Sequence, residues 1–161
     1  MRVRFLIDFM GLAPRVIHLV RHPVGYVSSN MKHKRATVGS SIRAWNRRQG
    51  QIHRLRPGFP PDGWLTLRYE DLCLHTGQEV EKMLEFLGLE PSDAWAGRLH
   101  RQEHHVLGNE MRLRWPAQIE LDHSWRIRLS NADIEMTLRR TQRWRGAFGY
   151  REWDLLSRHQ R

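Results

Sequence analysis

The chain has few of the features that tie a protein together covalently or attach it to a membrane. Only one of its 161 residues, Cys73, is a cysteine, so no disulfide can form within the chain. We expect this thiol simply to pack. No run of 18 or more apolar residues occurs, so no transmembrane helix is predicted. The apolar stretch Phe5–Met10 is interrupted by Asp8 and is too short for a signal peptide. We therefore expect a cytoplasmic protein.

Acidic residues are also few, with 17 Asp and Glu against 27 Lys and Arg and a formal charge of +10. Such a surface favours anionic partners: a nucleotide, an acidic or sulfated acceptor, or nucleic acid. A solvated basic face is the simpler explanation, and charge alone does not choose among these. The length corresponds to about one domain, so residues 1–161 are interpreted as a single domain.

The most informative segment runs from residue 15 to residue 29. Its apolar, β-branched residues at positions 16, 17, 19 and 20 predict a buried strand that Arg21 closes. Pro23 suits the first turn of a following helix, and Ser29 lies within that helix, eight residues after Arg21. A guanidinium fork and a hydroxyl placed in this way can hold one phosphate between them.

Hydrophobic periodicity predicts the remaining elements. A second strand is expected at Trp64–Arg68. Thr76 and Glu79 match a capping box that would start a helix, and Gly88 would end it. Ser130 is expected to cap a final helix that reaches about Trp144. Further helices are predicted at 3–11 and at about 40–56, the latter amphipathic with a basic face.

The strand with Arg21 and Ser29 resembles the 3′-phosphate-binding segment of sulfotransferases, which use 3′-phosphoadenosine 5′-phosphosulfate (PAPS) as sulfuryl donor. Other stretches resemble the same family in the same order, over roughly residues 5–150. They are Trp64–Asp71 with its Arg-Tyr-Glu-Asp end, the helix Val80–Leu89, and Gly108–Arg114 followed by Trp125-Arg126. The last is similar to the Gly-Asn-x-x-Arg segment of the carbohydrate-type branch.

The resemblance implies a three-layer α/β fold with a parallel sheet, like that of P-loop nucleotide kinases, and transfer of a sulfuryl group from PAPS to a hydroxyl or amine. It implies that Arg21, Ser29, Tyr69 and Arg112 bind the 3′-phosphoadenosine end, which the product 3′-phosphoadenosine 5′-phosphate (PAP) retains. Tyr69 would meet the adenine and Arg112 the 3′-phosphate. Alternatively, Tyr69 anchors its own loop and Arg112 and its neighbour Arg114 are ordinary surface residues.

One expected motif is missing from the sequence. The family's 5′-phosphosulfate loop is a Gly-rich strand–loop–helix, and no G-x-x-x-x-G-K-[ST] run or looser equivalent occurs here. By the same resemblance, the usual His or Glu base would precede Met1. We therefore expect a domain that is N-terminally incomplete and inactive alone, and we assign no catalytic residue.

Two other functions fit parts of the sequence. The basic surface could belong to a non-catalytic module that binds nucleic acid or a polyanionic glycan. His100 and His104 match H-x-x-E-H, a zinc-protease pattern, but no second motif supports it, so no metal site is expected. The prediction remains a nucleotide donor with a small-molecule or glycan acceptor, and no specific nucleic acid. Neither the acceptor nor the oligomeric state follows from the sequence.

Overall fold

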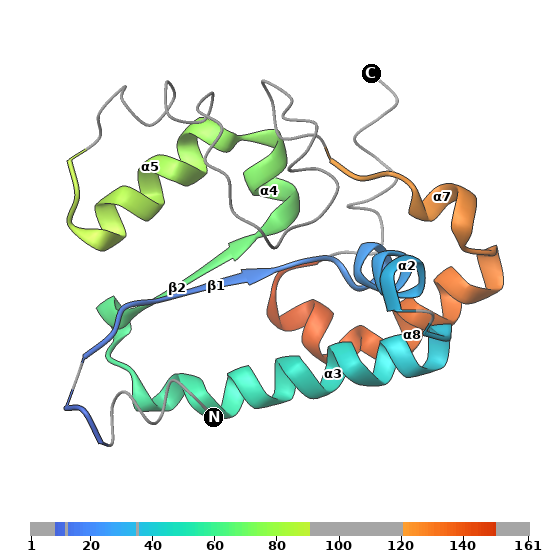
Figure 1. The fold of residues 1–161 in the computed structure, drawn as a ribbon, viewed down its shortest axis with the longest axis horizontal. Coiled ribbons are helices and arrows are strands. Elements are labelled where there is room, and N and C mark those ends of the chain that lie inside the picture. The colour runs from blue at the N-terminus through green and yellow to red at the C-terminus, as the bar shows by residue number, and fades with distance from the viewer. Residues whose placement is uncertain (1–8, 12, 35, 91–120, 151–161) are drawn as a thin grey trace.

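The computed structural model describes residues 9–11, 13–34, 36–90 and 121–150 (Figure 1). Most of the helix predicted at 3–11 lies outside these residues. The described strands are β1 (Val16–Val20) and β2 (Trp64–Arg68). The described helices are α2 (Pro23–Lys34), α3 (Val38–Leu55), α4 (Tyr69–Leu74), α5 (Thr76–Leu87), α7 (Trp125–Arg128) and α8 (Asn131–Ala147), with short 3-10 turns at Arg56–Gly58 and Pro61–Gly63.

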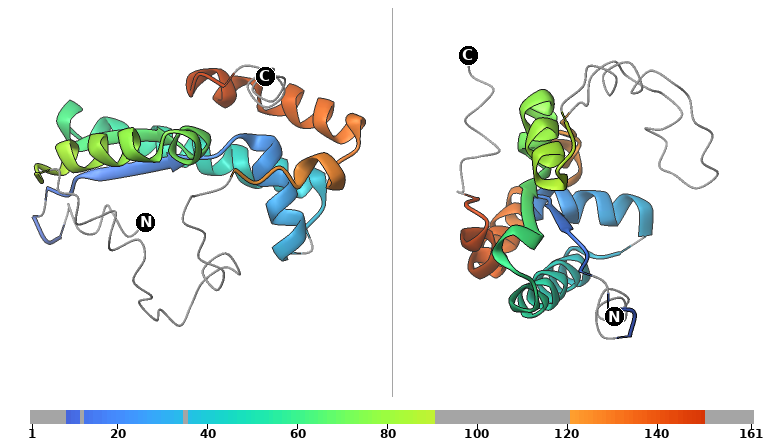
Figure 2. Two further views of the ribbon diagram at one scale, coloured as in Figure 1. Left: turned by 90° about the horizontal axis from the view of Figure 1, so that it is seen from above. Right: turned by 90° about the vertical axis from the view of Figure 1, so that its left-hand side faces the viewer.

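The two strands form a parallel pair in which Val16 lies opposite Trp64 and Val20 lies opposite Arg68. Parallel neighbours need a crossover, and α2 and α3 supply it. Helices α3 and α8 lie on one side of the strands and α4 and α5 on the other (Figures 1 and 2). The described part is therefore an α/β fold built on a parallel sheet, as predicted.

Strand β1 is buried on one face, so the prediction of a buried strand holds for that face and not for the other in the described part. His18 and Val20 are buried, whereas Ile17 and Leu19 are 36% and 49% exposed. Successive side chains of a strand point to opposite faces, which separates these two pairs. In the part of the chain that the structure describes, the second face is thus incompletely covered.

The apolar core lies between α2, α3, α7 and α8. Val24, Val27, Ile42, Trp125 and Leu129 form one cluster. A second cluster joins the end of β1 to α3 and to the chain after α8, through Val20, Trp45 and Tyr150. This core therefore packs directly beneath the turn that leads from β1 into α2.

The helix ends follow from local capping. Pro23 opens α2 as predicted, and the Ser130 cap of α8 is confirmed, with Asp133 completing a capping box. Helix α3 begins slightly earlier than predicted, because Thr37 forms a capping box with Ser40.

The capping box predicted for α5 is wrong. The Thr76 hydroxyl donates instead to the carbonyl of Leu72, and the Glu79 carboxylate pairs with Lys82. The cause is a short helix that the sequence patterns missed: α4 ends directly before α5, which leaves no free N-terminus to cap. Gly88 does end α5, with φ of +71° and a bond from the next amide to Leu84.

Within the described residues, no helix is both long and apolar enough to cross a bilayer.

Candidate functional site

Two of the predicted site residues meet at the carboxyl edge of the strands. Arg21 follows β1 and Tyr69 follows β2, and parallel strands end at the same edge of a sheet. The Arg21 guanidinium carbon lies 4.7 Å from the centre of the Tyr69 ring, so the cation stacks on the aromatic face. Both side chains are half-buried. The edge therefore presents a cation and an aromatic ring side by side.

Helix α2 is shaped to receive the guanidinium. A Cβ atom added at Gly25 would lie only 2.9 Å from Nε of Arg21, so only glycine allows this approach. The Nε atom is buried and has no hydrogen-bond partner among the described residues. A buried donor without an acceptor is costly in a folded protein. This N–H is therefore available to an acceptor that is not part of the described chain.

Ser29 lies one helical turn after Gly25, on the same face of α2. It is half-buried, and no hydrogen bond joins it to Arg21 in the described structure. Its neighbour Ser28 is fully buried, and the Ser28 hydroxyl has no partner in the described part either. The spacing noted in the sequence thus places Ser29 on the helix face against which the guanidinium rests.

An acidic residue that the sequence reasoning missed also contacts Arg21. Asp122 Oδ2 accepts a hydrogen bond of 3.0 Å from Nη2 of Arg21. Burial raises the pKa of Asp122, but hydrogen bonds from Ser124 and Arg21 outweigh it and bring the pKa to about 2. Asp122 is therefore a carboxylate at neutral pH. It uses one of the five guanidinium N–H donors and leaves others free.

Tyr69 is held as a neutral phenol. Burial, followed by a hydrogen bond with Cys73, raises its pKa above the ordinary value. The hydroxyl therefore anchors the residue to its own helix, and the ring supports Arg21, while contact of Tyr69 with an adenine stays a prediction. Burial also raises the pKa of the Cys73 thiol, so Cys73 is not an activated nucleophile.

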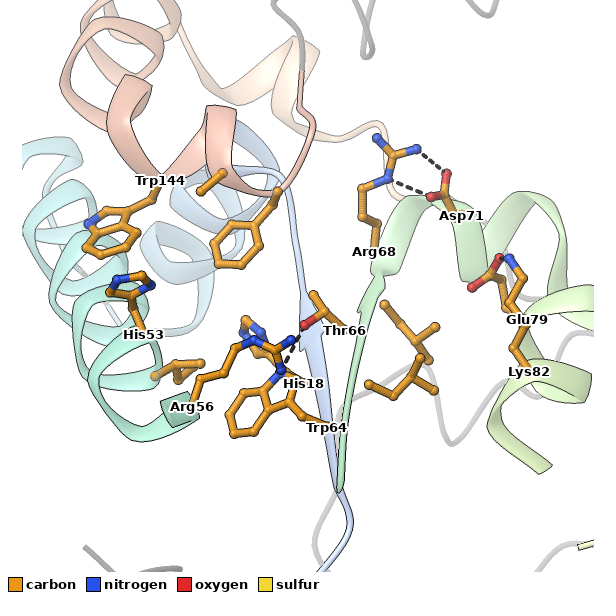
Figure 3. A pocket seen from close by; sticks show the side chains of 15 residues that line it. His18, His53, Arg56, Trp64, Thr66, Arg68, Asp71, Glu79, Lys82 and Trp144 are labelled. Atoms are coloured by element: carbon orange, nitrogen blue, oxygen red, sulfur yellow. Dashed lines mark hydrogen bonds and ion pairs between the residues drawn. The ribbon is translucent and has the colours of Figure 1, made fainter. Parts of the chain in front are cut away.

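A separate groove of about 630 Å³ runs along β2, between α5 and the ends of α3 and α8 (Figure 3). Arg68 pairs with Asp71 there, and Lys82 pairs with Glu79. His18 lines it as well; burial lowers the pKa of His18, and a hydrogen bond with Gln49 partly opposes this. Carboxylates thus neutralise Arg68 and Lys82, whereas Arg56, which also lines the groove, lies over the Trp64 ring. None of the predicted site residues that the structure describes lines this groove, so the Arg21 edge remains the candidate site.

The remaining sequence candidates lie outside the described residues. Arg112 and Arg114 are among them, so the contact of Arg112 with a phosphate stays a prediction. His100 and His104, the two histidines of the zinc-protease pattern, also lie outside the described residues. Among the residues that the structure does describe, no group of three or more His, Cys, Asp or Glu side chains is arranged to hold a metal ion.

Comparison with known proteins identifies the family of the chain. A model described as the Sulfotransferase family matches residues 13–93, half of the chain. The match runs from β1 beyond α5 and so includes Arg21, Gly25, Ser29 and Tyr69. No curated protein matches, and no solved structure does. On the strength of the family match, the chain belongs to the sulfotransferase family.

Proposed function

We propose that the chain binds PAPS as sulfuryl donor and that Arg21, Ser29, Tyr69 and Arg112 hold its 3′-phosphoadenosine end. The observation that carries the proposal is the buried Nε–H of Arg21, which lies over Gly25 without an acceptor. A phosphate oxygen is a suitable acceptor for it. The Ser29 hydroxyl, on the same helix face, is a second donor for the same group.

The residues present fit an adenosine 3′-phosphate better than a simple anion. The Tyr69 ring is aromatic and neutral, and such a ring can stack on or pack against a base. Arg21 already stacks on that ring, so the phosphate donors and the aromatic surface are neighbours. A bare phosphate would contact the donors but not the aromatic surface.

The proposed reaction is transfer of a sulfuryl group to a hydroxyl or amine of a small molecule or glycan. The resemblance of Gly108–Arg114 to the carbohydrate-type branch favours a carbohydrate acceptor. When bound, the donor supplies the sulfuryl group. The chain's own residues are proposed to bind and orient the nucleotide. Orientation of the donor would accelerate the transfer by holding the reacting groups in position. Residues 1–161 are proposed to form one domain, and none of them is proposed as the catalytic base.

Calorimetry with PAP and AMP tests the proposal. PAP should bind more tightly, because only PAP carries the 3′-phosphate. Loss of a charge-assisted contact costs about 1.5–3 kcal/mol, so Arg21→Ala should weaken PAP binding by roughly tenfold or more. Arg47→Ala removes the same charge from an exposed position on α3 and should leave binding nearly unchanged. Equal affinity of the folded protein for PAP and AMP would refute the proposal.

A further inference from the structure

The backbone around Arg21 is held by three side chains from three other parts of the fold. The carbonyl of Val20 accepts a 3.0 Å bond from the Tyr150 hydroxyl, and the carbonyl of Arg21 accepts a 3.1 Å bond from the Trp45 indole. The next amide, that of His22, donates a 3.0 Å bond to Oε1 of Glu70. Three consecutive residues are thus fixed from α3, from α4 and from the chain after α8.

Glu70 and Tyr150 form the linked part of this arrangement. The Tyr150 hydroxyl lies 2.7 Å from Oε2 of Glu70 and shares its single hydrogen between this carboxylate and the Val20 carbonyl. Both carboxylate oxygens are thus engaged, one by Tyr150 and one by His22. Tyr150 is only 4% exposed, and its ring meets the His22 ring edge-on with centroids 5.1 Å apart. Gly149 has φ of +69°, a conformation that favours glycine and turns the chain so that Tyr150 reaches this position.

The same first turn of α4 also acts on the Arg21 side chain. Tyr69 precedes Glu70 and supplies the ring on which the guanidinium stacks. One turn of helix therefore holds Arg21 at both ends, the backbone through Glu70 and the guanidinium through Tyr69. Small misplacements of a binding group can cost much of its effect, so such support matters for a site that must recognise one phosphate.

We propose that Glu70 and Tyr150 are positioning residues that fix the β1–α2 turn and so aim Arg21 at the 3′-phosphate of the donor. The inference rests on the proposed function and assigns these residues no direct contact with the nucleotide. Trp45 contributes to the same turn, but it is also part of the apolar core, so its removal would not report on the turn alone.

The test is the ratio of the PAP and AMP affinities, which isolates recognition of the 3′-phosphate. Glu70→Ala and Tyr150→Phe should each lower this ratio by about three- to tenfold, a part of the Arg21→Ala effect. Glu70→Gln should retain the ratio. A Gln carbonyl can accept from the His22 amide and its N–H can donate to the Tyr150 oxygen, whose own hydrogen then bonds Val20.

Matched controls separate positioning from general damage. Glu81→Ala removes a carboxylate from an exposed position on the neighbouring helix α5, where it bonds neither the β1–α2 turn nor Tyr150 in the described structure. Tyr26→Phe removes a hydroxyl from a half-buried tyrosine packed against the same core clusters. Neither control should change the affinity ratio of the folded protein.

A readout without nucleotide keeps the inference distinguishable from the proposed function. Hydrogen exchange at the His22 amide should accelerate in Glu70→Ala and remain slow in Glu70→Gln and Glu81→Ala. If the wild-type protein does not prefer PAP to AMP, the proposed donor is refuted. Hydrogen exchange at the His22 amide would then still show whether Glu70 holds the β1–α2 turn. The inference is overturned if the wild type prefers PAP and Tyr150→Phe keeps the full ratio, or if Glu70→Gln loses as much as Glu70→Ala.

Discussion

Acidification should destabilise the protein through His22. This side chain is fully buried beside Arg21, and its Nδ1 accepts a 3.3 Å bond from the amide of Val24. Burial, together with the nearby Arg145 cation, lowers the pKa of His22 to about 3 from an ordinary value of 6.5. The folded state therefore keeps the ring neutral at a pH at which the unfolded chain protonates it.

The sign and size follow from proton linkage. Because the pKa is lower in the folded state, the stability contributed by neutral His22 is complete above pH 6.5 and is lost as the pH falls from 6.5 towards 3. Each pH unit in this window corresponds to about 1.4 kcal/mol per proton. Between pH 7.5 and 5.0 the loss from His22 alone is about 2 kcal/mol. His18, whose pKa burial also lowers, adds a loss of the same sign.

Urea unfolding at pH 7.5 and 5.0 measures this loss, and His22→Asn isolates its origin. Asparagine does not titrate, and its side-chain oxygen can accept the Val24 amide, so the start of α2 keeps its cap. The variant should therefore lose about 2 kcal/mol less than wild type between the two pH values. The exposed His33, also on α2, gives a control, since His33→Asn should behave as wild type. Equal acid sensitivity of His22→Asn and wild type would refute the reasoning.

Three further changes test other parts of the structure. Gly25→Ala places a methyl group 2.9 Å from Nε of Arg21 and should weaken PAP binding by about tenfold in calorimetry, whereas Gly39→Ala, whose Cβ would lie 3.6 Å from the Arg43 guanidinium, should not. Ser130→Ala removes the cap of α8 and should lower the free energy of unfolding in urea by about 1 kcal/mol. If the formal charge of +10 is a solvated face, DNA binding measured by fluorescence anisotropy should be weak and fall steeply with added salt. Tight, sequence-selective binding at physiological salt would instead favour a nucleic-acid module.

Much of the local structure could be predicted from the sequence, because it depends on neighbouring residues. The β-branched run before Arg21, the proline at the start of α2, the glycine after α5 and the serine before α8 each act within a few residues. The exception is α4, where six residues follow β2 without a pattern long enough to show a helical period.

The candidate site shows the same division. Arg21, Ser29 and Tyr69 were predicted from motifs, and the structure stacks Arg21 on Tyr69 and places Ser29 on the adjoining face of α2. The contact of Asp122 with Arg21 could not be predicted, because a single acidic residue 101 positions from Arg21 belongs to no recognisable motif. Tyr150 is similar: its hydroxyl meets Val20 across 130 positions.

Spacing and capping are properties of a short stretch of chain, so they predicted Arg21 and Ser29 as candidate phosphate ligands and the starts of α2 and α8. Tertiary structure alone decided how Arg21 is held. The stack on Tyr69, the close approach to Gly25, and the bonds from Glu70, Trp45 and Tyr150 form only after the strands pair and the helices pack. Contacts between distant segments depend on the whole fold, and no local pattern encodes them.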